Sequence, residues 1–296
     1  MDTLVYIIVL NWNGWRDTVD CVKSCGKLTY PHFRILIVDN GSTDGSESAL
    51  RERFPDVEFL QTGANLGFAG GNNVGILYAL EKGADHVWLI NNDTIVDPEA
   101  LSALVRVAQC TTRVGMVGSK IVYHDNPRLL WYAGAVLDPV RPWRMHHRGL
   151  REEDGGQYDR LEETGFVTGC SLLASRDMIT GIGLMDEAYF LYFEDSDWSV
   201  RARMEGWKLY YSPASLVRHK VSVSLGGAAS PLMKYYYSRN FLNFVKKHFP
   251  DRFPMSFVYC LFQHVLVAAK KGDFAGAGLA LKGITHYVKG RKGFYP

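Results

Sequence analysis

The sequence predicts an α/β protein with a mostly parallel central sheet flanked by helices and with a helical C-terminal extension. Continuous apolar, β-branched runs such as residues 4–10 (LVYIIVL) are typical of strands that are buried on both faces. These runs alternate with helical patterns through residues 4–123, which is the order of elements that builds a parallel sheet. From residue 231 to the end, the pattern is helical throughout.

Each element is expected from its own local pattern. Strands are predicted at 4–10, 34–39, 57–61, 86–91, 114–123, 169–175 and 207–213. Helices are predicted at 17–26, 46–53 and 72–81, after Pro98, and at 196–205, where Gly206 ends the last one. Residues 65–73 (NLGFAGGNN) are interpreted as a Gly/Asn loop that opens a helix. Residues 123–164 are expected to form loops and short strands over one side of the sheet.

The composition is that of a globular chain with an uneven charge distribution. Of the 296 residues, 47% are hydrophobic, and the net charge of +2 argues against a dedicated nucleic-acid-binding protein. Residues 1–230 are expected to form the α/β domain and residues 231–296 a basic, amphipathic helical extension. The extension holds 11 of the 33 Lys and Arg but 2 of the 31 Asp and Glu, so it carries +9 and the rest of the chain −7. This asymmetry predicts an anionic partner for the extension, such as a membrane surface.

Two apolar stretches and the cysteines indicate whether the chain is expected to be secreted, to span a membrane or to bind zinc. The N-terminal residues lack a basic n-region and a cleavage site, so a strand and not a signal peptide is expected there. The run 255–269 contains Gln263 and His264 and is shorter than the ~20 residues of a membrane span, so an interfacial or core helix is expected. No further Cys pair or nearby His completes a zinc set around Cys21 and Cys25, so buried free thiols in a reducing cytosol are expected.

Polar residues follow three of the predicted strands at the point where each strand ends. Asn11 and Asn13 end the first, Asp39 ends the second, and residues 91–93 (NND) end the fourth. Ligands of open α/β sheets collect at the carboxyl ends of the strands, so a binding site is expected on this rim. Each end also has a structural alternative, since Asp39 could hold an Asx turn and the NND segment could cap the helix near Pro98.

A nicotinamide-dependent oxidoreductase and a P-loop protein do not fit this rim. The first strand is followed by NWNGW and not by G-x-G-x-x-G, and the glycine-rich residues 67–71 come after the third strand without that spacing. The sequence also lacks G-x-x-x-x-G-K-[ST].

Five segments together resemble the family 2 glycosyltransferases of the GT-A fold, and most closely the bacterial rhamnosyltransferase branch that builds cell-surface polysaccharide. They are 8–14 (IVLNWNG), 37–46 (IVDNGSTDGS), 65–73 (NLGFAGGNN), 89–98 (LINNDTIVDP) and 183–198 (GLMDEAYFLYFEDSDW). The resemblance covers residues 3–219 in the order of the family. It implies an inverting transfer of a sugar from a nucleotide-diphosphate sugar, dTDP-rhamnose or a UDP-sugar, to an acceptor hydroxyl. The alternative is a non-catalytic nucleotide- or glycan-binding module on the same fold.

The resemblance also implies which residues meet the nucleotide. Asp39 would accept hydrogen bonds from the base or ribose, and Asp93 would bind a divalent metal or the ribose. The set implied to lie beside the nucleotide is Asn11, Asn13, Asp39, Asn65, Gly71, Asn72, Asn92 and Asp93. The glycines of the turn at 70–72 would let the backbone approach it closely.

A divalent metal, Mg²⁺ or Mn²⁺, is the implied cofactor, because oxygen ligands and a diphosphate suit a hard cation. The segment 91–93 matches the D-x-D element of the family, but its first acid is Asn91 here. A carboxamide is a weaker, neutral metal ligand than a carboxylate. Metal dependence is still expected, but this motif supports it less than an intact D-x-D would. His219 is the second candidate ligand, and an ordinary strand-end histidine is its alternative.

Three acids stand in the aromatic stretch 189–198: Glu194, Asp195 and Asp197. An apolar setting raises a carboxyl pKa and makes the carboxylate a stronger base, which glycosyl transfer needs at the acceptor hydroxyl. By resemblance to the E-D motif of the family, Asp195 is the expected base and Glu194 is expected to help bind the acceptor. Asp197 fits the first turn of a helix, and the structural alternative makes all three acids helix-start residues.

The expected partners follow from the same resemblance. Relatives use glycan or polyprenyl-diphosphate-linked acceptors at the inner face of the plasma membrane. A cytoplasmic protein is therefore expected, with peripheral membrane contact through the extension. The extension fits equally a homo-oligomer interface or packing against the main domain. Residues 235–237 (YYY) are expected to be core rather than a sugar platform.

Overall fold

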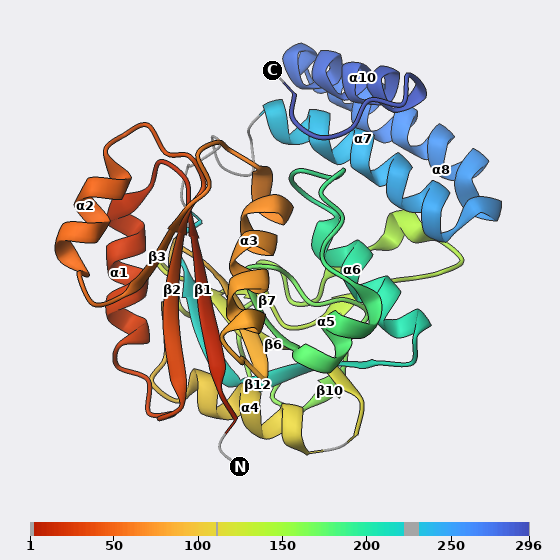
Figure 1. Cartoon of the computed structure of the whole chain (residues 1–296). Coiled ribbons are helices and arrows are strands. Elements are labelled where there is room, and N and C mark those ends of the chain that lie inside the picture. The colour runs from red at the N-terminus through yellow and green to blue at the C-terminus, as the bar shows by residue number, and fades with distance from the viewer. Residues whose placement is uncertain (1–2, 111, 222–230, 296) are drawn as a thin grey trace.

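A computed structural model describes residues 3–110, 112–221 and 231–295 of the chain. Figure 1 shows a central sheet covered by helices on both faces, with a separate group of helices from the end of the chain beyond α6. The strands are β1 (Val5–Asn11), β2 (Phe33–Asp39), β3 (Glu58–Gln61), β4 (His86–Asn91), β5 (Thr94–Val96), β6 (Val114–Tyr123), β7 (Leu130–Tyr132), β8 (Ala135–Val136), β9 (His146–His147), β10 (Glu162–Glu163), β11 (Ser171–Ser175) and β12 (Lys208–His219).

The helices of the α/β part are α1 (Trp15–Cys25), α2 (Ser46–Arg53), α3 (Gly67–Glu81), α4 (Ala100–Gln109), α5 (Arg176–Ile182) and α6 (Glu194–Met204). Those of the extension are α7 (Pro231–His248), α8 (Phe253–Cys260), α9 (Val267–Lys270) and α10 (Phe274–Val288). A π-helical turn, Leu261–Leu266, joins α8 to α9, and short 3-10 turns lie at Pro142–Arg144 and Pro250–Arg252.

The main sheet has the strand order β10-β12-β6-β11-β4-β1-β2-β3, with β5 paired to β12 and β7 to β6. The strands β1 to β4 run parallel, and β6 runs parallel to β12. The exception in the centre is β11, which runs antiparallel to both β4 and β6. The mostly parallel sheet is thus confirmed, and the reversed strand brings the start of β11 to the rim where β4 ends.

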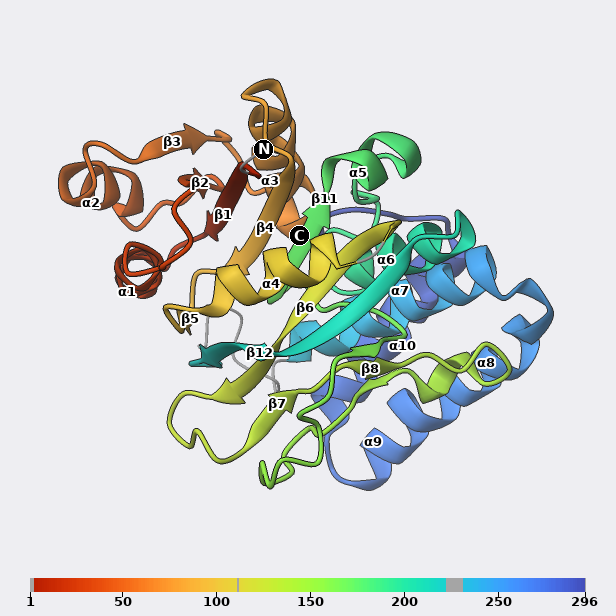
Figure 2. The same ribbon diagram turned by 90° about the horizontal axis from the view of Figure 1, so that it is seen from below.

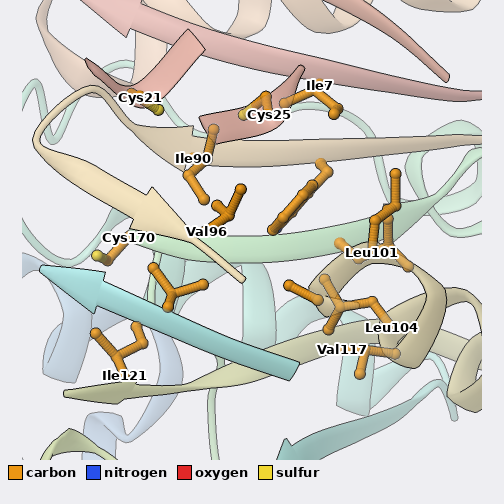
Figure 3. Packing of buried hydrophobic residues seen from close by; sticks show 14 of the residues in the cluster. Ile7, Cys21, Cys25, Ile90, Val96, Leu101, Leu104, Val117, Ile121 and Cys170 are labelled. Atoms are coloured by element: carbon orange, nitrogen blue, oxygen red, sulfur yellow. The ribbon is translucent and has the colours of Figure 1, made fainter. Parts of the chain in front are cut away.

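Alternate residues of the strands fill two cores, one on each face of the sheet. Ile7 and Val9 of β1 join the core under α1 and α4, whereas Tyr6 and Ile8 join the core under α3, α5 and α6. Figure 3 shows part of the first core, in which Ile7 lies beside Cys25, and Leu101 and Leu104 of α4 lie beside Val117. Burial on both faces explains why the strands appear as continuous apolar runs in the sequence.

Helix α3 begins at Gly67, five residues before the predicted start, so the predicted Gly/Asn turn at 70–72 is wrong. The glycines are inside the helix because it lies very close to the sheet. A Cβ on Gly71 would lie 2.6 Å from Leu10 Cδ1, and one on Gly75 would lie 2.8 Å from Ile8 Cγ2. The low helix propensity of glycine is offset by this close packing of helix on sheet.

The extension is joined to the α/β part through α7. Figures 1 and 2 show α7 beside α6, with α10 alongside α7. Phe241, Leu242 and Phe244 of α7 share a buried cluster with Tyr189 and Phe193, which precede α6. The predicted core role of 235–237 is confirmed for Tyr235 and Tyr236, which are buried.

Candidate active site

The strand register brings the three polar strand ends to one level of the rim. Asn11 pairs with Asp39 across β1 and β2, and Leu10 pairs with Asn91 across β1 and β4. The carboxyl ends of these parallel strands therefore meet at one edge, as predicted.

Asp39 is fully buried and is the centre of a hydrogen-bond network. Its Oδ1 accepts from Asn11 Nδ2 at 2.8 Å and from the Ser42 hydroxyl, and its Oδ2 accepts from Gln61 Nε2 at 2.6 Å. A carboxylate has about four acceptor sites, so three donors leave room for one more. Asn13 Oδ1 accepts from Thr43 N at 2.8 Å and ties the loop after β1 to the loop after β2.

Asn40, which the sequence analysis did not single out, organises the loop that carries Asn65. Its Nδ2 donates to Asn65 Oδ1 at 3.1 Å and to Gly67 O at 3.0 Å, and its Oδ1 accepts from Leu66 N at 3.0 Å. The side chain of Asn72 is buried on α3 and donates to Phe68 O at 2.9 Å. The close approach at Gly71 is to protein atoms, and the nucleotide roles of Gly71, Asn72 and Asn65 stay predictions.

Thr18 of α1, also missed from the sequence, links the ends of β1 and β4. Its Oγ1 donates to Asn11 Oδ1 at 2.7 Å and accepts from Asn92 Nδ2 at 3.0 Å. An unbroken chain of hydrogen bonds therefore runs from Asp39 through Asn11 and Thr18 to Asn92, the neighbour of Asp93. A threonine one turn into a helix gives no sequence signal of such a role.

Asp93 and His219 lie together because β12 pairs with β5, which follows Asp93 directly. The distance from Asp93 Oδ1 to His219 Nε2 is 3.2 Å, and both side chains are almost buried. Two neighbouring ligand atoms of an octahedral ion with bonds of about 2.1 Å lie about 3 Å apart, so this pair fits Mg²⁺ or Mn²⁺. Burial lowers the pKa of His219, but Cys170 and Asp93 raise it above the usual range, so a metal ion would have to displace a proton.

The metal would have few ligands from the protein. Within 3–110, 112–221 and 231–295, no group of three or more His, Cys, Asp and Glu side chains is arranged so that it could hold a metal ion. Asp93 and His219 fit an ion whose remaining ligands come from elsewhere, as Mg²⁺ does when it binds substrate phosphates.

Asp195 is held beside the end of β4 by the reversed strand β11. Asn91 N donates to Cys170 O at 3.0 Å, and the preceding Gly169 N donates to Asp195 Oδ2 at 2.9 Å. Asp195 Oδ1 accepts from Ser196 N at 2.6 Å and from Ser196 Oγ at 3.1 Å. The structure therefore brings Asp39, Asp93 and Asp195 to one connected rim.

The environment of Asp195 makes it a stronger base than an ordinary aspartate. Burial raises its pKa above the usual 3.8, although the hydrogen bonds from Gly169 and Ser196 oppose the shift. The side chain is half-buried, so one part of it remains open to a ligand.

Glu194 lies next to it and is more deeply buried. Its side chain is 5% exposed, and its Oε2 has no hydrogen-bond partner among the described residues. Burial and the neighbouring Asp195 raise its pKa well above the usual range. A buried polar atom without a partner is costly, and the described residues supply no donor to this oxygen.

Asp197 has a different, structural role. It is fully buried, and its carboxylate lies 2.9 Å from Arg201 Nε, 2.7 Å from Lys247 Nζ and 2.7 Å from His248 Nε2. Burial alone would raise its pKa, but these three cationic or hydrogen-bonding partners hold it well below the usual range. The helix-start alternative therefore holds for Asp197, whose partners also join α6 to α7.

The loop before Glu194 is fixed by two residues of α7 that sequence reasoning missed. Asn240 Nδ2 donates to the carbonyls of Tyr189, Leu191 and Tyr192 at 2.8, 2.7 and 2.9 Å, and Arg239 donates to Tyr189 O at 2.9 Å. The loop has left-handed backbone at Phe190, Tyr192 and Phe193, a conformation that costs about 1–2 kcal/mol for a non-glycine residue. The available signal was two adjacent polar residues within an otherwise aromatic and apolar helix face.

The fold and the rim define an α/β domain that presents a network of polar side chains and an acid of raised pKa at one edge of its sheet. The family model of the glycosyltransferase-like family 2 matches residues 2–237. The chain belongs to the family 2 glycosyltransferases, and the predicted enzyme class is confirmed.

Relatives and solved structures agree with this assignment. An N-acetylglucosaminyl-diphospho-decaprenol L-rhamnosyltransferase of Mycobacterium tuberculosis is 31% identical over 235 residues, which are 72% of this chain and 75% of that protein. A dTDP-rhamnosyl transferase of Shigella flexneri, RfbF, is 24% identical over 265 residues, 84% of this chain and 83% of that protein. The predicted resemblance to the bacterial rhamnosyltransferase branch is thereby confirmed.

Two solved structures share the fold. A mannosyltransferase of Pyrobaculum calidifontis, in complex with GDP-Man and Mn²⁺, has a TM-score of 0.60 at 17% identity, covering 96% of this chain and 76% of that one. GalNAc-T7 with UDP, GalNAc and Mn²⁺ has a TM-score of 0.60 at 16% identity, covering 88% of this chain and 58% of that one. The GT-A fold is confirmed.

Proposed function

We propose that this glycosyltransferase moves a rhamnosyl or hexosyl group from a nucleotide-diphosphate sugar to an acceptor hydroxyl in cell-surface polysaccharide or glycolipid synthesis, with inversion at the anomeric carbon. The observation that carries the proposal is the attachment of Asp195 to Gly169, which holds an acid of raised pKa beside the strand end that bears Asp93.

The chain itself would supply a base and the positions of two substrates. Asp195 takes the proton of the acceptor hydroxyl while the oxygen of that hydroxyl bonds to the anomeric carbon of the donor sugar. The bond from that carbon to the diphosphate breaks at the same time, and the nucleoside diphosphate leaves. A single in-line displacement needs no covalent enzyme intermediate and inverts the configuration. Glu194 holds a second acceptor hydroxyl through its unpartnered oxygen.

The nucleotide would lie along the rim from Asp39 to Asp93. The remaining acceptor capacity of Asp39 suits a base N–H or a ribose hydroxyl, with Asn11, Asn13, Asn65 and Asn92 fixing the surrounding loops. The name of the Shigella relative favours dTDP-rhamnose as the donor, with a UDP-sugar as the second candidate. Gly71 and Asn72 would contribute to the nucleotide site indirectly, because Gly71 lets α3 pack closely on the sheet and Asn72 hydrogen-bonds to Phe68 within this helix.

A divalent cation would be held by Asp93 and His219. When bound, Mg²⁺ or Mn²⁺ would supply Lewis-acid stabilisation of the departing diphosphate. Both solved structures named above contain Mn²⁺, which supports this choice of cofactor.

The acceptor is proposed to be a glycan on a polyprenyl diphosphate, as the name of the mycobacterial relative states for that protein. Such an acceptor stays in a bilayer, so the protein would work in the cytoplasm as a peripheral protein of the inner face of the plasma membrane.

The test is release of nucleoside diphosphate from dTDP- and UDP-sugars, with and without Mn²⁺, in the presence of a lipid-linked acceptor. Asp195→Asn is expected to lower turnover by about 10²–10⁴-fold while nucleotide binding is retained, because only the base is removed. The matched control is Asp177→Asn on the exposed side of α5. Full turnover by Asp195→Asn would show that the base is assigned wrongly, and donor binding without turnover on any acceptor would support the non-catalytic module.

A further inference from the structure

The C-terminal helices expose an unusual share of the large apolar side chains of this protein. Of the 14 such side chains that are exposed among the described residues, eight belong to residues 255–294. They are Met255, Val258, Phe262, Leu266, Phe274, Leu281, Val288 and Phe294. Clusters of this kind mark interaction surfaces, whereas single exposed apolar residues need no explanation.

These side chains form stripes and are not scattered. Met255, Val258, Phe262 and Leu266 follow one another at intervals of three, four and four residues, which places them on one side of the helical stretch from α8 to α9. Each is 56–64% exposed. On α10, Phe274, Leu281 and Val288 recur every seven residues and are 48–74% exposed. Both stripes are apolar helix faces that lack a cover within the described chain.

The other sides of these helices are packed within the protein. Ser256, Cys260 and Ala268 are buried, and Cys260 shares a cluster with Phe241 of α7. A Cβ on Gly283 of α10 would lie 2.4 Å from the backbone oxygen of Tyr235 of α7, so the backbones of these two helices approach each other closely. Figure 2 shows α8 and α9 on the outer border of the molecule.

One helical stretch, Pro250–Lys270, is long and apolar enough to cross a membrane, with a mean hydropathy of 1.2. Only 17% of its apolar window is buried. To span a bilayer it would have to leave α7 and α10 and expose the buried side with Ser256 and Cys260. A helix that keeps one packed side and one apolar exposed side suits the interface of a bilayer, where it lies flat.

The positive charge of the extension favours an anionic partner for this surface. Residues 231–296 carry +9, and the exposed basic residues include Lys246, Lys270, Lys271, Lys289, Arg291 and Lys292. Two copies that met through this surface would bring like charges together, whereas an anionic surface would attract them. We propose that the exposed face of α8, α9 and α10 docks flat on an anionic lipid bilayer, with Phe262 and Leu266 among the acyl chains and Lys270 and Lys271 at the phosphates.

The proposal deepens the peripheral membrane contact proposed above, and rests on the proposed function for its purpose. Binding itself requires no turnover, so it is tested without donor or acceptor. The first assay is flotation with vesicles of phosphatidylcholine, with and without phosphatidylglycerol, at low and high salt. The wild type is expected to float with the anionic vesicles and to be released partly by salt.

Two double variants separate the apolar and the ionic contributions. Phe262→Ser with Leu266→Ser is expected to weaken partitioning at least about tenfold, and Lys270→Glu with Lys271→Glu to weaken it severalfold and remove its salt dependence. The matched controls on the α/β part are Leu77→Ser with Met204→Ser, and Lys23→Glu with Lys27→Glu, all exposed. Equal nucleotide binding by all four would show that each variant is folded.

A fluorescent probe reports the depth of the contact. Cys110→Ser first removes the exposed native thiol, and Phe262→Cys is then labelled with an environment-sensitive dye. The fluorescence emission of this dye is expected to shift to the blue on anionic vesicles. The same dye on Ser48→Cys of α2 is expected to show no shift. Retention by vesicles at alkaline pH would indicate a span and overturn the flat geometry. Absence of flotation, or a dimer that Phe262→Ser with Leu266→Ser turns into a monomer without lipid, would overturn the bilayer as the partner. Flotation by Asp195→Asn as for the wild type separates this proposal from the catalytic one.

Discussion

Asp197 Oδ1 lies 2.7 Å from His248 Nε2, and this contact joins α6, the helix that begins with Glu194 and Asp195, to the last turn of α7. Lys247 Nζ reaches the same oxygen at 2.7 Å, and Arg201 Nε reaches the other at 2.9 Å. The extension is therefore attached to the catalytic domain through the element that positions Glu194 and Asp195.

Asp197→Asn is expected to lower the free energy of unfolding by about 3 kcal/mol, because it removes a fully buried negative charge that pairs with Arg201, Lys247 and His248, of which Arg201 and His248 are themselves largely buried. Urea denaturation measures this change. The pKa of Asp197 is lowered in the folded state, so its stabilisation is present above the ordinary value of 3.8 and is lost as the pH falls through the folded pKa. The control is Asp186→Asn, which removes an exposed partner of Lys247 and should cost under about 0.5 kcal/mol. Equal stability of the two variants would contradict the assignment.

Asn240→Ala is expected to lower kcat about 10- to 100-fold while the affinity for the nucleotide changes little, because the carbonyls of Leu191 and Tyr192 lose their side-chain donor and that of Tyr189 keeps only the one from Arg239. Steady-state kinetics and nucleotide titration separate the two effects. Asn243→Ala, one turn further along the same helix, removes an amide that donates only within α7 and serves as the control. A parallel loss of affinity and kcat would instead indicate general unfolding.

The fold could be predicted from the sequence where one local pattern decided the structure. The buried strands have continuous apolar runs, and their polar ends meet because parallel strands share a direction. The start of α3 could not be predicted, since glycine favours a turn locally and only the contact of Gly71 with Leu10 reverses that preference.

The residues of the site also fall into those that the sequence could predict and those that it could not. Asp195 and Glu194 could be chosen from a family motif, but nothing near Asp197 in the sequence indicates that two of its three partners come from residues 247 and 248. The same holds for Asn40 and Thr18, whose hydrogen bonds join loops that only the folded sheet brings together.

The acidic limb of the kcat/KM profile is expected above pH 3.8, the ordinary value for aspartate, because burial raises the pKa of Asp195. Ser196→Ala removes a hydroxyl that donates to the charged form, so the pKa of Asp195 should rise further and the limb should move to higher pH. Ser48→Ala on α2 should leave the profile unchanged. A shift to lower pH would show that another group controls this limb.

Asp93→Asn and His219→Gln are each expected to weaken Mn²⁺ binding, in the presence of nucleoside diphosphate, at least about tenfold, because each removes one of the two side chains proposed to hold the ion. Isothermal titration of Mn²⁺ measures the affinity without turnover. Asp97→Asn is the control, since Asp97 Oδ1 accepts a hydrogen bond from Glu99 N that an asparagine can also accept. If the pair acts as an ion pair alone, both variants will bind Mn²⁺ as the wild type does and will lose stability instead. If His219 is only a strand-end histidine, Asp93→Asn alone will lose affinity, and the remaining ligands must then come from the diphosphate and water.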